Sequence, residues 1–265
     1  MNRLLLAAVL FPVLAQAQLA NAAESQECGP AVFAALGRAL EVAHFVPGPY
    51  DFGKDAAGVV VVSVCRRMPD DPKLTLAAVG WNAGRESSKA LVVAIVDEGA
   101  ATVVASQRED IDEDETTRLN ALRLDTAPYT LAPGVRAFGV DVYSDNPGCG
   151  DGGLGPSRTL YVRDGKTLRP VLQSVFISEY RYLRGNQPRC IGPGESQETI
   201  SETYAVTIGL GAPGKDGWKD LLLTVTPSRD DHRPSTLKPL RVRVPYDGNG
   251  YSLKPFDAAY VKWRR

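Results

Sequence analysis

The fold is indicated most directly by the stretch Ala90-Leu91-Val92-Val93-Ala94-Ile95-Val96, an unbroken apolar run rich in β-branched residues. A second run, Val59 to Val64, has nearly the same character. β-Branched side chains favour extended backbone, and runs without polar alternation are typical of strands covered on both faces. The sequence therefore predicts two strands that are buried on both sides.

Elsewhere apolar and polar residues alternate, as they do in strands with one solvated face. Arg241-Val242-Arg243-Val244 alternates strictly, and Tyr204, Val206 and Ile208 follow the same period. Further strands are expected at Leu74–Trp81, Thr102–Gln107, Phe138–Val142, Thr159–Arg163, Leu168–Gln173, Phe176–Leu183, Asp220–Thr226 and Tyr251–Lys254. Roughly a dozen short strands at this spacing predict an all-β fold, mainly an antiparallel meander.

Three turns between strand-like runs share an acid followed by glycine, at Glu98-Gly99, Asp164-Gly165 and Asp247-Gly248. Glycine tolerates the positive φ of tight turns, and an acid can accept hydrogen bonds from the turn backbone. Such loosely repeated hairpins fit either an irregular sandwich or a small propeller-like stack. The sequence leaves both architectures open.

Helical periodicity is clear in one segment, Pro30 to Val42, where proline suits the first turn. Its apolar side chains recur close to every 3.6 residues, at Val32, Phe33, Leu36 and Leu40. A second short helix is expected within Asp112–Leu122, because acids at its start favour the positive end of a helix dipole. The predicted fold class is thus all-β with one short N-terminal helix after the leader.

Residues 1–22 have the layout of a secretory signal peptide. Arg3 supplies a positive charge, Leu4 to Leu14 is largely apolar, and small residues precede the expected cleavage after Ala22. The apolar run is shorter than the roughly 18 residues that an anchoring helix needs, and no later stretch is apolar enough to span a bilayer. We therefore expect residues 23–265 to form a single exported domain, soluble in the periplasm or outside the cell.

All four cysteines lie in the expected mature chain, and export makes disulfides their default state. Cys28–Cys65 and Cys149–Cys190 are the preferred pairs, because partners close in sequence are more easily brought together. The chain has no C-x-x-C pair, which disfavours both a zinc site and a redox-active pair.

The formal charge is nearly balanced, with 30 basic and 31 acidic residues, so there is no electrostatic case for nucleic-acid binding. The motifs G-x-S-x-G and G-x-x-x-x-G-K-[ST] are also absent. Their absence disfavours an α/β-hydrolase and a P-loop nucleotide-binding enzyme.

One candidate metal site is acidic. Asp110, Asp112 and Asp114 have the D-x-D-x-D spacing of a calcium loop. An EF-hand loop counted from Asp110 would need glycine in place of Glu115 and a bidentate glutamate in place of Ala121. The run is better interpreted as a solvated helix start, and no cofactor is expected unless calcium binds here.

Two segments are candidates for ligand binding. The glycine-rich stretch from Asp145 to Gly153 carries carboxylates at Asp145 and Asp151 and can turn tightly around a ligand. In a strand, Tyr180, Tyr182 and Arg184 would share one face. Tyrosine rings can stack on sugar rings, and guanidinium groups can form bidentate hydrogen bonds with carboxylate or phosphate. The segment therefore suits sugars that carry these acidic groups.

These features favour an exported, non-catalytic module that binds an envelope protein or an anionic envelope glycan. Two alternatives remain from the sequence. One is a hydrolase with paired carboxylates, for which Asp145 and Asp151 are the first candidates. The other is a protein that binds calcium for structural stability at Asp110, Asp112 and Asp114.

Overall fold

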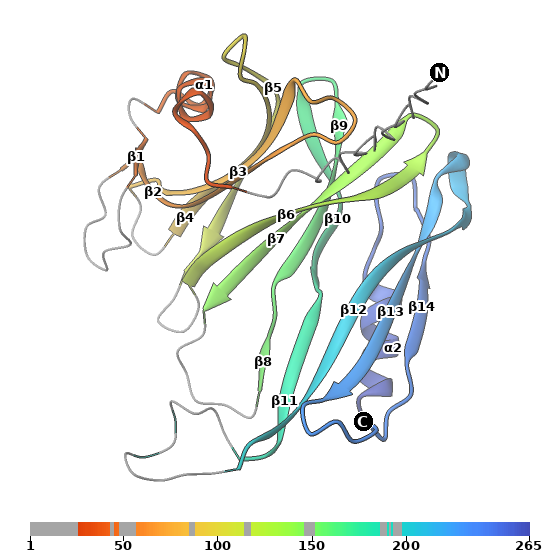
Figure 1. Cartoon of the computed structure of the whole chain (residues 1–265). Helices are drawn as coiled ribbons and strands as arrows, with labels where there is room; N and C mark the ends of the chain where they lie inside the picture. Colours follow the sequence, from red (N-terminus) through yellow and green to blue (C-terminus); the bar gives the residue numbers. More distant parts are fainter. Residues whose placement is uncertain are drawn as a thin grey trace, which may run out of the picture.

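The structure is a computed structural model that describes residues 26–42, 45–47, 57–84, 88–113, 118–145, 152–185, 190, 192 and 198–265. The predicted signal peptide, residues 1–22, lies outside these ranges. The described strands form two sheets, accompanied by a helix near each end of the chain (Figure 1).

The larger sheet has nine strands in the order β1-β2-β3-β4-β5-β10-β9-β7-β6. Their bounds are β1 Val46–Pro47, β2 Val59–Arg67, β3 Leu74–Asn82, β4 Ser88–Asp97, β5 Thr102–Asp112, β6 Arg118–Ala132, β7 Val135–Asp145, β9 Ser157–Asp164 and β10 Thr167–Phe176. Only β1–β2 and β5–β10 pair in parallel, and the latter pairing is a single register position. The predicted antiparallel meander is therefore confirmed in β2 to β5.

The smaller sheet has five antiparallel strands in the order β14-β13-β12-β11-β8. Their bounds are β8 Gly152–Leu154, β11 Ser178–Arg184, β12 Ile200–Pro213, β13 Lys219–Arg229 and β14 Leu240–Val244. A one-turn 3-10 helix, Lys215–Gly217, lies between β12 and β13. One long, bent hairpin joins the two sheets. Its strands β9 and β10 pair in the larger sheet, and β8 and β11 pair in the smaller sheet, with the bends at Pro156 and Ile177 between the two pairs.

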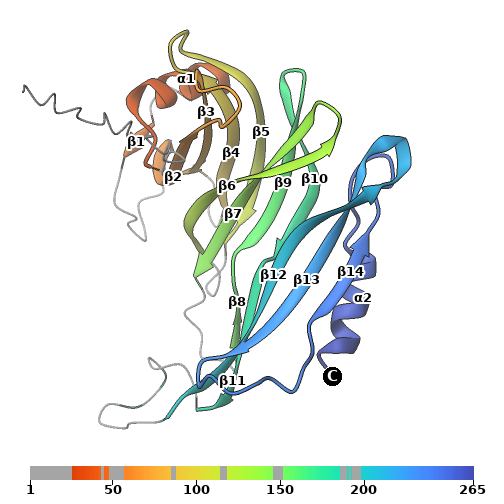
Figure 2. The ribbon, with the colours of Figure 1, turned by 45° about the vertical axis from the view of Figure 1, so that its right-hand side comes forward.

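The nine-stranded sheet curls until β6 packs against β2 (Figure 2). Gly80 on β3 permits this approach, since a Cβ atom there would lie 2.5 Å from a methyl carbon of Leu119 on β6. Apolar side chains fill the interior of the curl, among them Leu76, Leu91, Ile95, Leu124, Phe138 and Tyr161. A side chain at position 80 would therefore require Leu119 to move.

Helix α1, Pro30–Leu40, covers the outer side of β2 to β4 and confirms the helix that was predicted there. The Cys28–Cys65 disulfide, also predicted, joins the segment before this helix to β2. Covered on both sides, Ala90–Val96 is at most 1% exposed, as the unbroken apolar pattern predicted. Val59–Val64 is less enclosed, because β2 has only the two-residue strand β1 on its outer edge.

A second core lies between the two sheets and helix α2, Lys254–Trp263. The nine-stranded sheet contributes Leu131, Leu160 and Leu172, and the five-stranded sheet contributes Tyr204, Leu221, Leu223 and Val225. Two packed sheets correspond to the irregular sandwich rather than to propeller blades. Among the described residues, no helix is both long enough and apolar enough to cross a membrane.

Two local predictions are wrong. In the described part of Asp112–Leu122 the expected helix is absent: β5 runs to Asp112, and β6 begins at Arg118. Glu113 between them is held by tertiary contacts, a buried ion pair with Lys89 at 3.2 Å and a hydrogen bond from the Leu119 amide. The strand expected at Tyr251–Lys254 is reduced to a single bridge between Tyr246 and Tyr251, and Lys254 begins α2.

Candidate functional site

The glycine-rich candidate segment is only partly described. Asp145 ends β7, but its side chain lies outside the described residues, as do Asp151 and Cys149. Cys190 is disulfide-bonded, whereas its expected partner Cys149 falls in the undescribed segment. The carboxylate pair and the second disulfide therefore stay predictions.

The acidic candidate lies on an extended strand. Asp110 and Asp112 are exposed on β5, opposite Ala90 and Ser88 of β4, while Asp114 lies outside the described residues. A strand places alternate side chains in a straight row, whereas a calcium loop curves its oxygens around one ion. The described part of the chain holds no group of three or more potential metal-ligating side chains.

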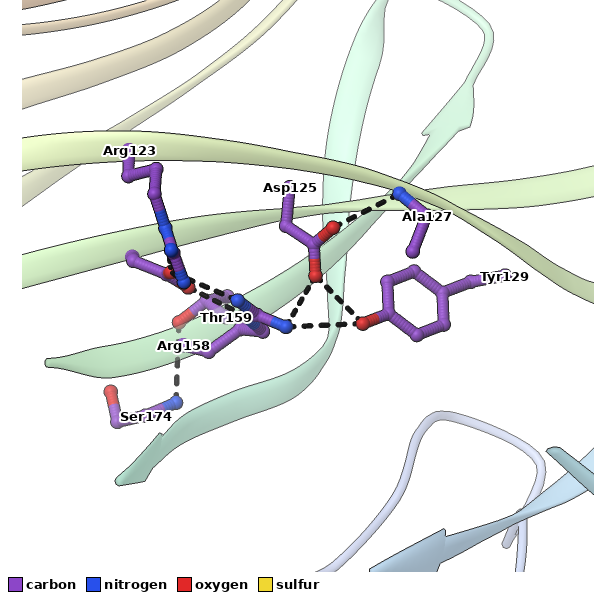
Figure 3. Close-up of polar contacts among 8 residues, drawn as sticks. Arg123, Asp125, Ala127, Tyr129, Arg158, Thr159 and Ser174 are labelled. Atoms are coloured by element: carbon purple, nitrogen blue, oxygen red, sulfur yellow. Dashed lines mark hydrogen bonds and ion pairs between the residues drawn. The ribbon is translucent and has the colours of Figure 1, made fainter. Parts of the chain in front are cut away.

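A polar cluster lies across β6, β7 and β9 (Figure 3). The register sets Arg123, Asp141 and Arg158 directly opposite one another on three neighbouring strands. Arg158 donates to both carboxylate oxygens of the fully buried Asp141, from Nε at 2.5 Å and from its second terminal nitrogen at 2.9 Å. Arg123 donates to the same carboxylate from the solvent side at 2.7–2.9 Å.

The other end of Arg158 is also engaged. It donates to the hydroxyl of Tyr129 at 3.1 Å and forms an ion pair with Asp125. Tyr129 in turn donates to Asp125 at 2.7 Å. Burial, reinforced by the bond to Asp125, raises the pKa of Tyr129 to about 12. The phenol thus stays protonated at neutral pH, and the two carboxylates are held by guanidinium groups, which is the chemistry of a structural tie rather than of an acid–base pair.

The Tyr/Arg segment lies on β11. Tyr180 and Tyr182 point to the same side of the five-stranded sheet, with their ring centroids 5.7 Å apart in an edge-to-face arrangement. Tyr180 lies over Gly153 of β8, where a Cβ atom would come 2.8 Å from its ring and hydroxyl. The predicted shared face therefore holds for the two tyrosines.

Arg184 departs from that face. A bulge between Tyr182 and Arg184 shifts the register, so Tyr182 lies opposite Ser201 and Arg184 lies opposite Ile200. Directly opposed residues point to the same side of a sheet, so Arg184 leaves the tyrosine side. Its guanidinium forms an exposed ion pair with Glu198 at 2.6 Å.

The tyrosines belong to a larger surface, which we call the outer face. It is the side of β11 to β14 that points away from the core between the sheets, and α2 lies only on the opposite, inner face (Figure 2). Small hydroxyl-bearing side chains dominate its centre. The outer face comprises Tyr180, Tyr182, Ser201, Thr203, Ala205, Thr207, Gly209, Leu222, Thr224, Thr226, Ser228, Arg241 and Arg243.

Two arginines border the outer face on the β14 side. Arg243 is largely exposed and forms an ion pair with the buried carboxylate of Asp220. Arg241 is exposed and makes no ion pair with any residue that the structure describes. The alternation of β14 indicated that these arginines would face solvent, but not that the sheet order would set them on the same face as the tyrosines.

Comparison with known proteins gives no relative. No known protein family, no curated protein and no solved structure matches this chain.

Proposed function

We propose that this protein is an exported, non-catalytic module whose outer face binds an anionic glycan. The observation that carries the proposal is the open face itself, which has tyrosines on β11, arginines on β14 and small hydroxyl side chains between them. The core side of the same strands is closed by apolar packing and α2. The outer face is therefore the side of this sheet that is open to a large ligand.

The chemistry of the outer face suits charged sugars. Tyrosine rings present apolar faces against which sugar rings can stack, and threonine hydroxyls donate and accept hydrogen bonds. Arg241 and Arg243 supply forked donors for carboxylate or phosphate groups. Three strand spacings, about 14 Å, separate β11 from β14 across the sheet. Along β12 the register sets Tyr180 level with Thr203 and Arg241 level with Thr207, about 13 Å further on, so a ligand that contacts both would have several linked rings.

Export is supported by two independent features. The first 22 residues have the sequence of a leader. The Cys28–Cys65 disulfide is of the kind that persists in oxidising compartments. An anionic polymer at the cell envelope would be accessible to a protein in that location.

The test uses polygalacturonate as an acidic probe and dextran as a neutral one, with affinity measured by calorimetry. We expect Arg241→Ala to weaken polygalacturonate binding about fivefold to tenfold, because a charge-assisted hydrogen bond contributes roughly 1 kcal/mol or more. Tyr182→Ala should weaken it by a similar factor through lost ring contact. Binding should also fall as salt is raised.

Lys166→Ala is the matched control, because it removes one positive charge from the exposed β9–β10 turn of the other sheet. It should leave the affinity unchanged. Failure of the wild-type protein to bind polygalacturonate, or equal losses in Arg241→Ala and Lys166→Ala, would contradict the proposed surface.

A further inference from the structure

A pocket of about 250 Å³ lies on the other side of the five-stranded sheet, between β10, β11, β12 and α2. Four of its lining residues are aromatic, namely Phe176, Tyr204, Phe256 and Tyr260. The remaining lining residues are Ser174, Val175, Ser178, Glu179, Val206, Leu253 and Asp257. The pocket is separate from the outer face, because Tyr204 and Val206 belong to the inner side of β12.

Two of these aromatic residues lie side by side on α2. Phe256 and Tyr260 stack one turn apart on α2, with ring centroids 5.7 Å apart and an interplanar angle of 18°. Phe176 also lines the pocket and is 44% exposed. The negative faces of aromatic rings attract organic cations, and clustered rings of this kind suit alkylated ammonium groups.

The first carboxylate of the pocket is fixed in place. Glu179 accepts a hydrogen bond from the Tyr260 hydroxyl at 2.7 Å and forms an ion pair with Arg264. Burial and the bond to Glu179 raise the pKa of Tyr260 above its usual value, so the phenol remains a donor. Glu179 is therefore neutralised by Arg264 and mainly positions Tyr260.

The second carboxylate is available. Asp257 lies in the first turn of α2 and is exposed at the pocket rim. Among the described residues, none donates a hydrogen bond to its carboxylate or forms an ion pair with it. This includes Lys254, which lies one turn earlier on α2. The pocket thus combines aromatic walls with one uncompensated negative charge.

We propose that this pocket binds a small organic cation with an alkylated ammonium group, held between the aromatic rings and the carboxylate of Asp257. The volume is below the roughly 300–1,000 Å³ of sites for drug-sized ligands, so it fits a compact ligand of few atoms. Anions are disfavoured, because the uncompensated carboxylate of Asp257 lines the hollow.

The experiment compares choline with 3,3-dimethylbutan-1-ol, which has nearly the same shape but no charge, by calorimetry on the mature protein. We expect choline to bind at least about tenfold more tightly, since an organic cation gains both the ring faces and the carboxylate. Asp257→Asn should weaken choline binding about fivefold and leave the neutral compound unaffected. Phe176→Ala, at the exposed rim, should weaken choline binding without unfolding the protein.

Asp216→Asn is the control for lost negative charge, because Asp216 is exposed on the short 3-10 helix after β12. It should bind choline like the wild type. Absence of choline binding at 10 mM ligand (a concentration of order the weakest useful affinity), equal affinity for the two compounds, or equal losses in Asp257→Asn and Asp216→Asn would each overturn the proposal.

Discussion

The two sheets each bury a cluster of arginine, carboxylate and tyrosine, but they complete it differently. In the nine-stranded sheet, Arg158 donates to Asp141, Asp125 and Tyr129 and is almost fully enclosed. In the five-stranded sheet, Arg181 donates to Glu202 at 2.9 Å and lies over the Tyr204 ring, yet its buried Nε has no acceptor. We call the first cluster saturated, because the Arg158 guanidinium is bound at both ends. The Arg181 guanidinium in the second cluster is only partly hydrogen-bonded.

The largest expected effect is on the saturated cluster. Asp141→Asn removes the charge that holds Arg158 while preserving the shape of the side chain. Breaking one partner of a buried ion pair typically costs about 3–5 kcal/mol, and Asp125 still compensates part of the charge, so we expect a loss of about 3 kcal/mol in unfolding free energy. Urea denaturation at neutral pH measures it.

Asp164→Asn is the matched control in the same sheet. Asp164 is largely exposed and reaches Arg169 only at 4.0 Å, so its loss should cost less than about 0.5 kcal/mol. If Asp141→Asn were as mild as this control, the cluster would not be the tie between β6, β7 and β9 that its geometry indicates.

A smaller, pH-dependent effect is expected in the second cluster. Burial opposes ionisation of Glu202, but hydrogen bonds from Ser235, Tyr204 and Arg181 outweigh it and lower the pKa of this carboxyl below 4.5. Since the folded state binds the proton less tightly than the unfolded state, this contribution is present above pH 4.5 and is lost as the pH falls through the folded pKa.

Glu202→Gln should therefore lower the unfolding free energy by about 1–2 kcal/mol at pH 7, and the difference from the wild type should shrink towards pH 3. Glu198→Gln is the control, because Glu198 forms only an exposed ion pair with Arg184. A difference that stayed constant between pH 7 and pH 3 would contradict an ionised, hydrogen-bonded Glu202.

The sequence predicted those parts of the fold whose pattern is local. Ala90–Val96 was recognisable as a strand covered on both faces because every one of its residues is apolar. Helix α2 was missed, although Phe256, Tyr260 and Trp263 recur at helical spacing and Pro255 suits a first turn. The helix expected within Asp112–Leu122 was wrong, because the acid Glu113 in the connection between β5 and β6 forms an ion pair with Lys89, which is distant in sequence.

The candidate site shows the same limit. Alternation along β11 correctly set Tyr180 and Tyr182 on one face, but it could not reveal the bulge that turns Arg184 away. Arg241 and Arg243 join the tyrosines only through the order of four strands, which no local pattern records. The pocket beneath α2 likewise depends on a tertiary contact, because the C-terminal helix and strands β10 to β12 together supply its lining.

The smallest expected effect concerns the outer face itself. Thr226 on β13 is exposed there, whereas its neighbour Val225 is fully buried on the inner face. Thr226→Ala should change the unfolding free energy by no more than about 0.5 kcal/mol, as is usual for exposed positions. Val225→Ala should cost about 2 kcal/mol or more, because it leaves a cavity in the core between the sheets. A large loss in Thr226→Ala would mean that the outer face is needed for folding, and its row of hydroxyl groups would then have a structural explanation in place of a binding one.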